Sequence, residues 1–239
     1  MTRLEGKKIA LIGHGAMGEL IELLAIEKGH QVAVVVDEFE ADRSASDLAE
    51  KIKNVDVAID FSVASAVRRN VEACVAAGVP LVEGTTGWND QRDEIERTVR
   101  EGMGAVVFGA NFSIGVNLFY RIVENAAQLF SKFDEYEVFI EEQHHSRKKD
   151  APSGTALKLK DIVGEHIKAD FNVTSTRAGN IPGTHRVGFD GPADQILLEH
   201  TARSREGFAL GAILAAEWIV GKTGFYEFSD VMDEMLSTK

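Results

Sequence analysis

Residues 7–37 read KKIALIGHGAMGELIELLAIEKGHQVAVVVD, two short apolar runs on either side of a segment with helical spacing. The first run ends in the pattern G-x-G-x-x-G, formed by Gly13, Gly15 and Gly18. In this pattern the first glycine permits a tight turn, the second lets the backbone approach a pyrophosphate, and the third lets helix and strand pack closely. The stretch therefore predicts a strand, a glycine loop and a helix whose N-terminus faces phosphate groups.

The second apolar run ends at Asp37, which lies 37 − 18 = 19 residues after Gly18. A carboxylate at this spacing accepts hydrogen bonds from an adenosine ribose and repels a 2′-phosphate. Glu38 adds to the repulsion, and Arg43, the nearest following cation, is distant for a phosphate clamp. The pattern favours NAD(H) over NADP(H). A glycine-rich turn without a ligand, and a polar strand end at Asp37, remain the alternatives.

The same alternation continues outward from this stretch to residue 111. Apolar runs at 56–62, 80–86 and 105–111 alternate with helical segments at 65–78 and 89–102. Near-continuous apolar strands that alternate with helices indicate a parallel sheet covered on both faces, so the fold class is α/β with a doubly wound sheet of the Rossmann type.

After Asn111 the pattern changes to α+β. Helices are predicted at 117–130 and 153–168, an antiparallel strand at 135–145, and further strands at 185–191 and 194–203. The apolar segment 207–221 predicts a helix that returns to the first sheet. We therefore expect a dinucleotide-binding domain of residues 1–111 and 211–239, with an inserted α+β substrate-binding domain of residues 112–210.

Charge and composition limit the classes of partner. The net charge is 26 − 38 = −12, which disfavours nucleic acid and anionic membrane surfaces. No apolar run reaches the roughly 18 residues that a membrane span needs, and the first residues lack a signal-peptide pattern. The single cysteine, Cys74, lies in an alanine-rich helical pattern and predicts a small buried side chain. We expect a cytoplasmic protein.

Residues 141–154, EEQHHSRKKDAPSG, gather positive charge in this acidic chain. Ser153 predicts a helix N-cap, and the N–H groups of Gly154 and Thr155 would then be available to an anion. Next to Lys148, this helix start indicates a carboxylate pocket, and a histidine beside it can donate a proton near neutral pH. A capped helix with no ligand remains the alternative.

A metal site is not expected at this cluster. His144 and His145 are neighbours, and neighbours on a regular strand point to opposite faces. The chain also has no cysteine pair and no H-E-x-x-H motif. A hydride donor in one domain and a carboxylate-binding acid in the other instead define a reductase of a small anion with an electrophilic C=O, C=C or C=N bond.

The motifs at this point resemble those of the 4-hydroxy-tetrahydrodipicolinate reductase (dihydrodipicolinate reductase) family of lysine and diaminopimelate biosynthesis. Segments 60–62, 84–88, 109–117 and 177–185 resemble that family's D-F-[ST], G-T-T-G, A-N-[FM]-S-x-G-V-N and R-x-G-x-x-P-G-x-H segments. The family's pattern E-x-x-H-H-x-x-K-x-D-x-P-S-G-T-A is matched by Glu141, His144, His145, Lys148, Asp150, Pro152, Ser153, Gly154, Thr155 and Ala156.

The resemblance implies an NAD(P)H-dependent reduction of 4-hydroxy-tetrahydrodipicolinate by a homotetramer. It also implies that the inserted domain, residues 112–210, is built on a mixed open sheet and serves oligomerisation as well as substrate binding. His144 and Lys148 would be the alternative proton donors, and the substrate dicarboxylate would be bound by His145, Lys148, Ser153, Gly154 and Thr155. The cofactor would be bound by Gly13, Gly15, Ala16, Met17, Gly18, Asp37, Phe61, Ser62, Gly84, Thr85, Thr86, Ala110, Asn111 and Phe112.

One departure from the family concerns the cofactor. The family's glycine loop often reads G-R-M-G, where the arginine can meet a 2′-phosphate, but this chain has Ala16 there. NADH is therefore the expected cofactor and NADPH the alternative.

Two other functions compete with this interpretation. An aspartate or homoserine dehydrogenase relative would share the glycine loop but not the H-H-x-x-K and P-S-G-T block. A non-catalytic NAD(H) sensor would bind cofactor without a competent acid site.

Overall fold

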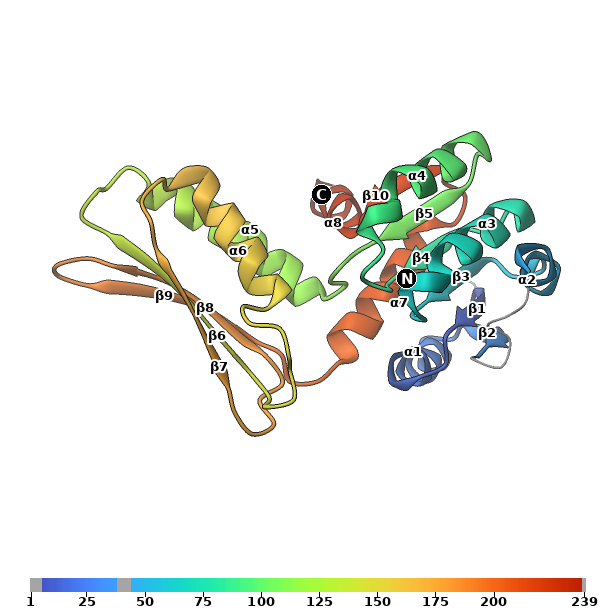
Figure 1. Cartoon of the computed structure of the whole chain (residues 1–239), viewed down its shortest axis with the longest axis horizontal. Helices are drawn as coiled ribbons and strands as arrows, with labels where there is room; N and C mark the ends of the chain where they lie inside the picture. The colour runs from blue at the N-terminus through green and yellow to red at the C-terminus, as the bar shows by residue number, and fades with distance from the viewer. Residues whose placement is uncertain (1–5, 38–43, 238–239) are drawn as a thin grey trace. The chain divides into compact units, whose positions relative to one another are not determined.

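The computed structural model describes residues 6–37 and 44–237. The chain forms two compact units, one of Met1–Ser113 with Phe208–Lys239 and one of Ile114–Gly207 (Figure 1). Glu38 and Arg43, which bear on the expected cofactor preference, lie outside the described residues. No helix in the described part of the chain is both long enough and apolar enough to cross a bilayer.

A six-stranded parallel sheet forms the centre of the first unit, in the order β10-β5-β4-β3-β1-β2. The order reverses direction between β1 and β3, because β2 lies on one side of β1 and β3 on the other. Its strands are β1 (Lys8–Ile12), β2 (Gln31–Val36), β3 (Val57–Asp60), β4 (Leu81–Glu83), β5 (Ala105–Phe108) and β10 (Gly224–Glu227).

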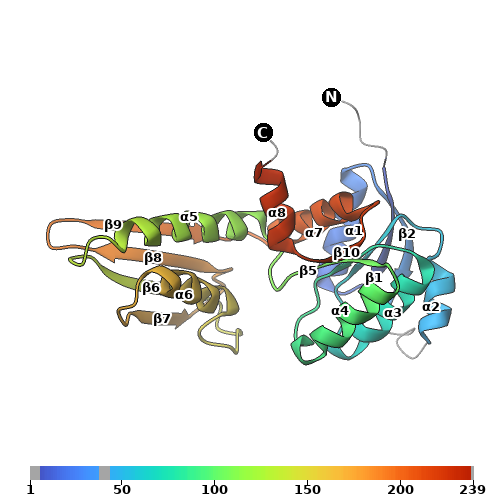
Figure 2. The ribbon, with the colours of Figure 1, turned by 90° about the horizontal axis from the view of Figure 1, so that it is seen from above.

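Helices cover both faces of this sheet (Figure 2). On one face the apolar sides of α2, α3 and α4 pack against β-strand residues such as Ala10, Ala58 and Leu81. On the other side lie α1 and α7. The helices of this unit are α1 (Ala16–Glu27), α2 (Ala45–Ile52), α3 (Val67–Ala77), α4 (Arg92–Glu101), α7 (Glu206–Ile219) and α8 (Phe228–Ser237), with short 3₁₀ turns at Ala64–Ala66 and Asn89–Gln91.

The second unit has a four-stranded mixed sheet in the order β7-β6-β8-β9, with α5 and α6 on one face (Figure 1). Its core lies between that face and the helices, where Val138, Ile140 and Phe189 meet Phe119 and Leu159. The elements are α5 (Ile114–Phe130), β6 (Glu137–His144), α6 (Gly154–His166), β7 (Asn172–Arg177), β8 (Thr184–Asp190) and β9 (Gln195–Thr201).

The predicted fold class, a doubly wound parallel sheet with a mixed sheet inserted, is confirmed. Pairing of the strand predicted at 135–145 is only partly antiparallel: β6 runs antiparallel to β8 but parallel to β7. The reason is the crossover through α6, which returns the chain in the same direction. Strands β7 and β10 and helices α2 and α8 are not anticipated from the sequence. Helix α2 has a readable signal, since Ser44 and Asp47 form a reciprocal capping box at its start.

Candidate active site

The glycine loop lies where β1 ends and α1 begins, as predicted. Gly13 has φ +85°, and a Cβ there would lie 2.6 Å from the Phe61 carbonyl oxygen. A Cβ on Gly18 would lie 2.3 Å from the Gly13 carbonyl oxygen, so only glycine fits both positions without a shift of backbone. These contacts fix a tight loop against the end of β3, at the reversal of strand order where α/β sheets bind ligands.

The mouth of this loop is open to an anion. Gly15 is the N-cap of α1, no side chain caps the helix, and a Cβ on Gly15 would meet nothing within 4 Å. Ala16 is exposed and Met17 half-buried, while Asp37 is exposed directly after β2. A bare helix N-terminus with a backbone that can be approached closely fits the pyrophosphate of a dinucleotide. The residues present therefore fit a nicotinamide dinucleotide, which supplies hydride when bound.

The structure also brings together the other residues expected to bind the cofactor. A Cβ on Gly84 would lie 2.2 Å from the Phe61 ring, and the Phe61 and Phe112 ring centroids are 6.1 Å apart. The Ser62 N–H donates to Thr85 Oγ1 over 3.0 Å. Thr86 and Ala110 are exposed next to this group, and Asn111 Oδ1 accepts a hydrogen bond from the Ser113 N–H. Loops from the ends of β3, β4 and β5 thus form one edge of the sheet.

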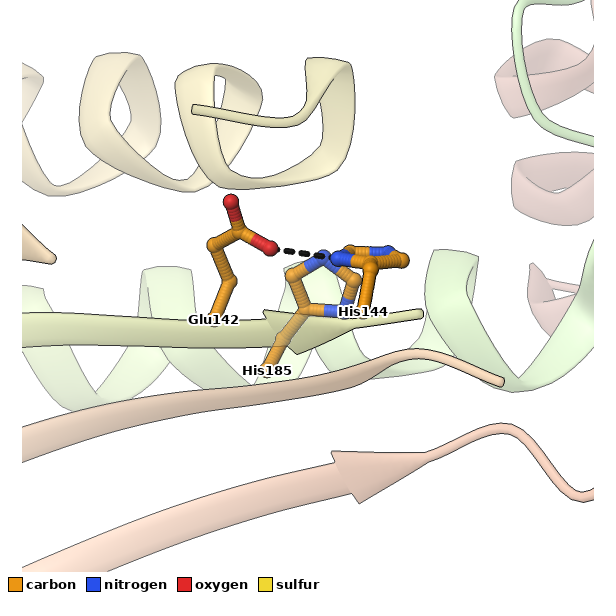
Figure 3. Close-up of side chains that lie close together, drawn as sticks. All are labelled: Glu142, His144 and His185. Carbon is orange, nitrogen blue, oxygen red and sulfur yellow. Dashed lines mark hydrogen bonds and ion pairs between the residues drawn. The ribbon is translucent and has the colours of Figure 1, made fainter. Parts of the chain in front are cut away.

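In the second unit, the histidine chemistry is organised by Glu142, whose side chain is fully buried. His144 Nδ1 is hydrogen-bonded to Glu142 Oε2, and the ring of His144 lies 5.1 Å from that of His185 (Figure 3). Arg177 donates to both carboxylate oxygens, over 2.9 and 2.6 Å. Two strand ends, β6 and β7, therefore deliver an imidazole and a guanidinium to one buried carboxylate.

The charges of this network follow from its contacts. Burial by itself would raise the pKa of Glu142, but hydrogen bonds from Arg177, Ser175 and His144 outweigh it and lower that pKa to about 2. Burial lowers the pKa of His144, Glu142 opposes this effect, and the charges of Lys148 and Arg177 add to the lowering. In the resting site Glu142 is an anion that accepts Nδ1–H of a neutral His144, which leaves Nε2 as the nitrogen for outside chemistry.

Helix α6 begins beside this network. Ser153 is its N-cap, as predicted, and Ser153 Oγ accepts from the Ala156 N–H over 3.2 Å. The same hydroxyl is 3.0 Å from His185 Nε2, and the Ser153 N–H donates to Glu142 Oε1 over 3.3 Å. Gly154 is exposed, and a Cβ there would meet nothing within 4 Å. The open first turn of α6 and the Glu142 network thus share one small region.

The remaining predicted residues lie in the turn between β6 and α6. Lys148 Nζ is 2.8 Å from Asp150 Oδ1, and the Lys148 N–H donates to the carbonyl of His145, which closes the turn. Nδ1 of His145 is buried without a hydrogen-bond partner among the described residues. Thr155 contacts the hydroxyl of Tyr120, whose pKa is raised by burial. The Lys148 ammonium group and Nδ1 of His145 could therefore form an ion pair or a hydrogen bond with a bound ligand.

Glu142, His144 and His185 place three groups of metal-ligating type within 4.8 Å of one another. Each is already engaged by the protein: Arg177 covers both oxygens of Glu142, Glu142 takes Nδ1 of His144, and Ser153 takes Nε2 of His185. In the part of the chain that the structure describes, this cluster is accounted for as a hydrogen-bond network.

Sequence reasoning missed three members of the site. The resemblance selects Glu141, but Glu141 is 43% exposed and lies 3.7 Å from Arg186, whereas Glu142 holds His144. Strand alternation could have found this, because Glu142 and His144 share the face of Val138 and Ile140. Arg177 and His185 stand in the segment 177–185 that resembles the family, yet spacing alone gives them no role.

The fold and the two sites define a two-unit oxidoreductase that binds a nicotinamide dinucleotide. The family model described as "Dihydrodipicolinate reductase, N-terminus" matches residues 7–112, and that described as "Dihydrodipicolinate reductase, C-terminus" matches residues 115–232. The chain belongs to the dihydrodipicolinate reductase family.

Individual relatives extend the same likeness over almost the whole chain. A protein of Christiangramia forsetii named 4-hydroxy-tetrahydrodipicolinate reductase is 36% identical, over 95% of this chain and 98% of its own length. One of Archaeoglobus fulgidus with the same name is 36% identical, over 92% and 96%. A dipicolinate-bound dihydrodipicolinate reductase from Paenisporosarcina sp. TG-14 has the same fold, with a TM-score of 0.76 and 20% identity over 94% of this chain and 99% of that one.

Proposed function

We propose that this chain catalyses the NADH-dependent reduction of 4-hydroxy-tetrahydrodipicolinate to tetrahydrodipicolinate, with NADPH as an alternative cofactor. The observation that carries the proposal is the Glu142–His144 pair beside the open N-terminus of α6, in a member of this family. Loss of the 4-hydroxyl as water precedes reduction of the ring. Such a biosynthetic role accords with the cytoplasmic location expected from the sequence.

The dicarboxylate is bound, in this proposal, by cations and backbone N–H groups of the second unit. Lys148 Nζ supplies charge, and its partner Asp150 is exposed, so the ion pair can open toward a ligand. The first turn of α6 offers N–H groups next to Gly154, and the buried Nδ1 of His145 gains a partner. Ser153 supports this group as the cap of α6.

His144 is the proposed proton donor, with Lys148 as the alternative. A bound nicotinamide cofactor would supply hydride to a ring carbon of the conjugated imine, and the protein would have to deliver a proton to the far end of the conjugation. Glu142 holds Nδ1 of His144, which orients Nε2. A bound dianion favours the imidazolium form, because opposite charge nearby raises the pKa of a histidine. Substrate binding would thereby load the proton that the reaction consumes.

The NADH preference is supported by Ala16 and Asp37. Ala16 offers no cation at the mouth of the glycine loop, and the Asp37 carboxylate follows β2 at the position where a ribose is bound. A 2′-phosphate would meet a negative charge there. We also propose the homotetramer that the family resemblance implies, which sedimentation velocity at micromolar protein concentration would test.

The decisive experiment is an assay that generates the imine in situ from pyruvate and aspartate semialdehyde and follows absorbance loss with NADH and NADPH separately. His144→Ala should lower kcat at least tenfold with NADH affinity little changed. Lys148→Ala should lower kcat and raise KM for the substrate, whereas Lys149→Ala, an exposed neighbour, should do neither. Near-wild-type turnover in both His144→Ala and Lys148→Ala would refute the assignment. NADH binding with no oxidation in the wild type would instead favour the sensor function.

A further inference from the structure

Two carboxyl groups are buried in the first unit. Asp60 and Glu83 are the last residues of β3 and β4 and are paired in register, with exposures of 0% and 1%. Burying two negative charges side by side is unfavourable, because each must be compensated by hydrogen bonds or lose its charge. The donors around each oxygen therefore indicate which group is ionised.

Asp60 is surrounded by donors. Its Oδ1 accepts from the Ser62 N–H over 2.8 Å, and its Oδ2 accepts from Asn70 Nδ2 over 2.5 Å. Asn70 in turn accepts two hydrogen bonds from the Arg69 guanidinium, over 2.7 and 3.0 Å. The amide of Asn70 thus links a positive charge to Oδ2. Burial raises the pKa of Asp60 as well, but the hydrogen bonds from Ser62 and Asn70 oppose that rise, which makes Asp60 the better place for the negative charge.

Glu83 is surrounded differently. Oε1 accepts from the Thr85 N–H over 2.7 Å, but Oε2 is buried with no donor among the described residues. Burial, followed by the charge of Asp60, raises the pKa of Glu83 well above its ordinary value. Among the residues that the structure describes, the other titratable group facing the pair is Cys74 on α3, whose pKa is itself raised by burial and by both carboxyls. Nothing described therefore supplies a positive charge to Oε2.

We propose that Glu83 keeps a proton on Oε2 and donates it to Asp60, and that this pair positions the two loops that follow β3 and β4. Ser62 is tied to Asp60 and to Thr85 Oγ1, while Thr85 is tied to Glu83 and, through its carbonyl, to Trp88 Nε1. These loops carry residues that are expected to bind the cofactor. The claim that the pair positions these loops for the cofactor therefore rests on the proposed function. Asp60 and Glu83 are positioning residues.

Comparing the Glu83→Gln and Glu83→Leu variants tests whether Glu83 is protonated or ionised in the wild type. The amide of Glu83→Gln can donate to Asp60 and accept from Thr85, as the protonated acid does, whereas Glu83→Leu can do neither. NADH affinity, measured by fluorescence titration at pH 7, should fall about tenfold in Glu83→Leu, the effect of one buried N–H left without its acceptor. Glu83→Gln should restore it to within about twofold of the wild type. A Glu83→Gln protein as weak as Glu83→Leu would overturn the proposal.

The pH dependence of unfolding tests the proton without any cofactor. A carboxyl whose pKa is raised by folding stabilises the protein fully below the ordinary pKa, and this contribution is lost as pH rises toward the folded pKa. From about pH 4.5 upward, the Tm of the wild type should therefore fall relative to that of Glu83→Gln, by about 3 to 5 °C per pH unit. Glu101→Gln, an exposed change on α4, should track the wild type. If the difference in Tm between the wild type and Glu83→Gln stays constant between pH 5 and 8, the proposal is overturned.

Infrared spectroscopy gives a direct readout at neutral pH. The wild type should show a protonated-carboxyl C=O band that is missing from Glu83→Gln, and its absence from the wild type would overturn the proposal. The two parts can fail separately. If the band and the Tm slope are found but the wild type binds no NADH, the proposed function fails and the proton pair stands.

Discussion

Glu142→Gln removes a buried negative charge while it keeps the size of the side chain. Folding lowers the pKa of Glu142 from the ordinary 4.5 to about 2, despite burial, because of Arg177, Ser175 and His144. At about 1.36 kcal/mol for each tenfold change in the acid dissociation constant, this lowering from 4.5 to about 2 corresponds to roughly 3.4 kcal/mol. Arg177 is 17% exposed, so solvent screening reduces the expected loss of unfolding free energy to about 2 kcal/mol.

Urea unfolding at pH 7 followed by far-ultraviolet circular dichroism measures this loss. Circular dichroism is needed because Trp88 and Trp218 both lie in the first unit, whereas Glu142 lies in the second. Glu141→Gln is the matched control. The Glu141 carboxylate is 43% exposed and lies 3.7 Å from the Arg186 guanidinium. Its removal should therefore cost less than about 0.5 kcal/mol of unfolding free energy.

The pH dependence provides a second check on Glu142. A carboxylate with a lowered pKa stabilises the fold above its ordinary pKa, near 4.5, and this contribution is lost as pH falls toward about 2. The difference between the wild type and Glu142→Gln should therefore shrink to less than half at about pH 3. A cost no larger than that of Glu141→Gln, or one that does not change with pH, would show that Glu142 does not hold this network by its charge.

Three further changes test other parts of the site. Gly18→Ala should lower NADH affinity more than tenfold, because its Cβ would lie 2.3 Å from the Gly13 carbonyl oxygen, and equilibrium titration that finds unchanged affinity would contradict the loop geometry. Ser153→Ala should cost about 1 to 2 kcal/mol in urea unfolding, because α6 loses its cap and His185 a partner; Ser146→Ala, an exposed change in the preceding turn, is the control. Asp37→Ser should raise kcat/KM for NADPH relative to NADH, and an unchanged ratio of the two would show that Asp37 does not select the cofactor.

Much of the fold follows from local pattern. The run from Lys8 to Val36 contains its own strand, glycine loop, helix and second strand, so local periodicity predicts it. Short elements carry less signal: β7 (Asn172–Arg177) is polar and largely exposed, and β10 (Gly224–Glu227) has only four residues. Both are strands because a neighbouring strand pairs with them, which no local window contains.

The sequence by itself determined the glycine loop, the N-cap at Ser153 and the cluster that carries His144 and Lys148, because each depends on residues a few positions apart. Only the tertiary structure decided the partners of these residues. Arg177 and His185 lie 33 and 41 positions beyond His144 (177 − 144 and 185 − 144), and sheet pairing brings them to Glu142 and Ser153. Likewise Asp60 and Glu83 become a carboxyl pair because β3 and β4 are neighbours in register. Charge state depends on such long-range neighbours and on burial, so spacing along the chain cannot supply it.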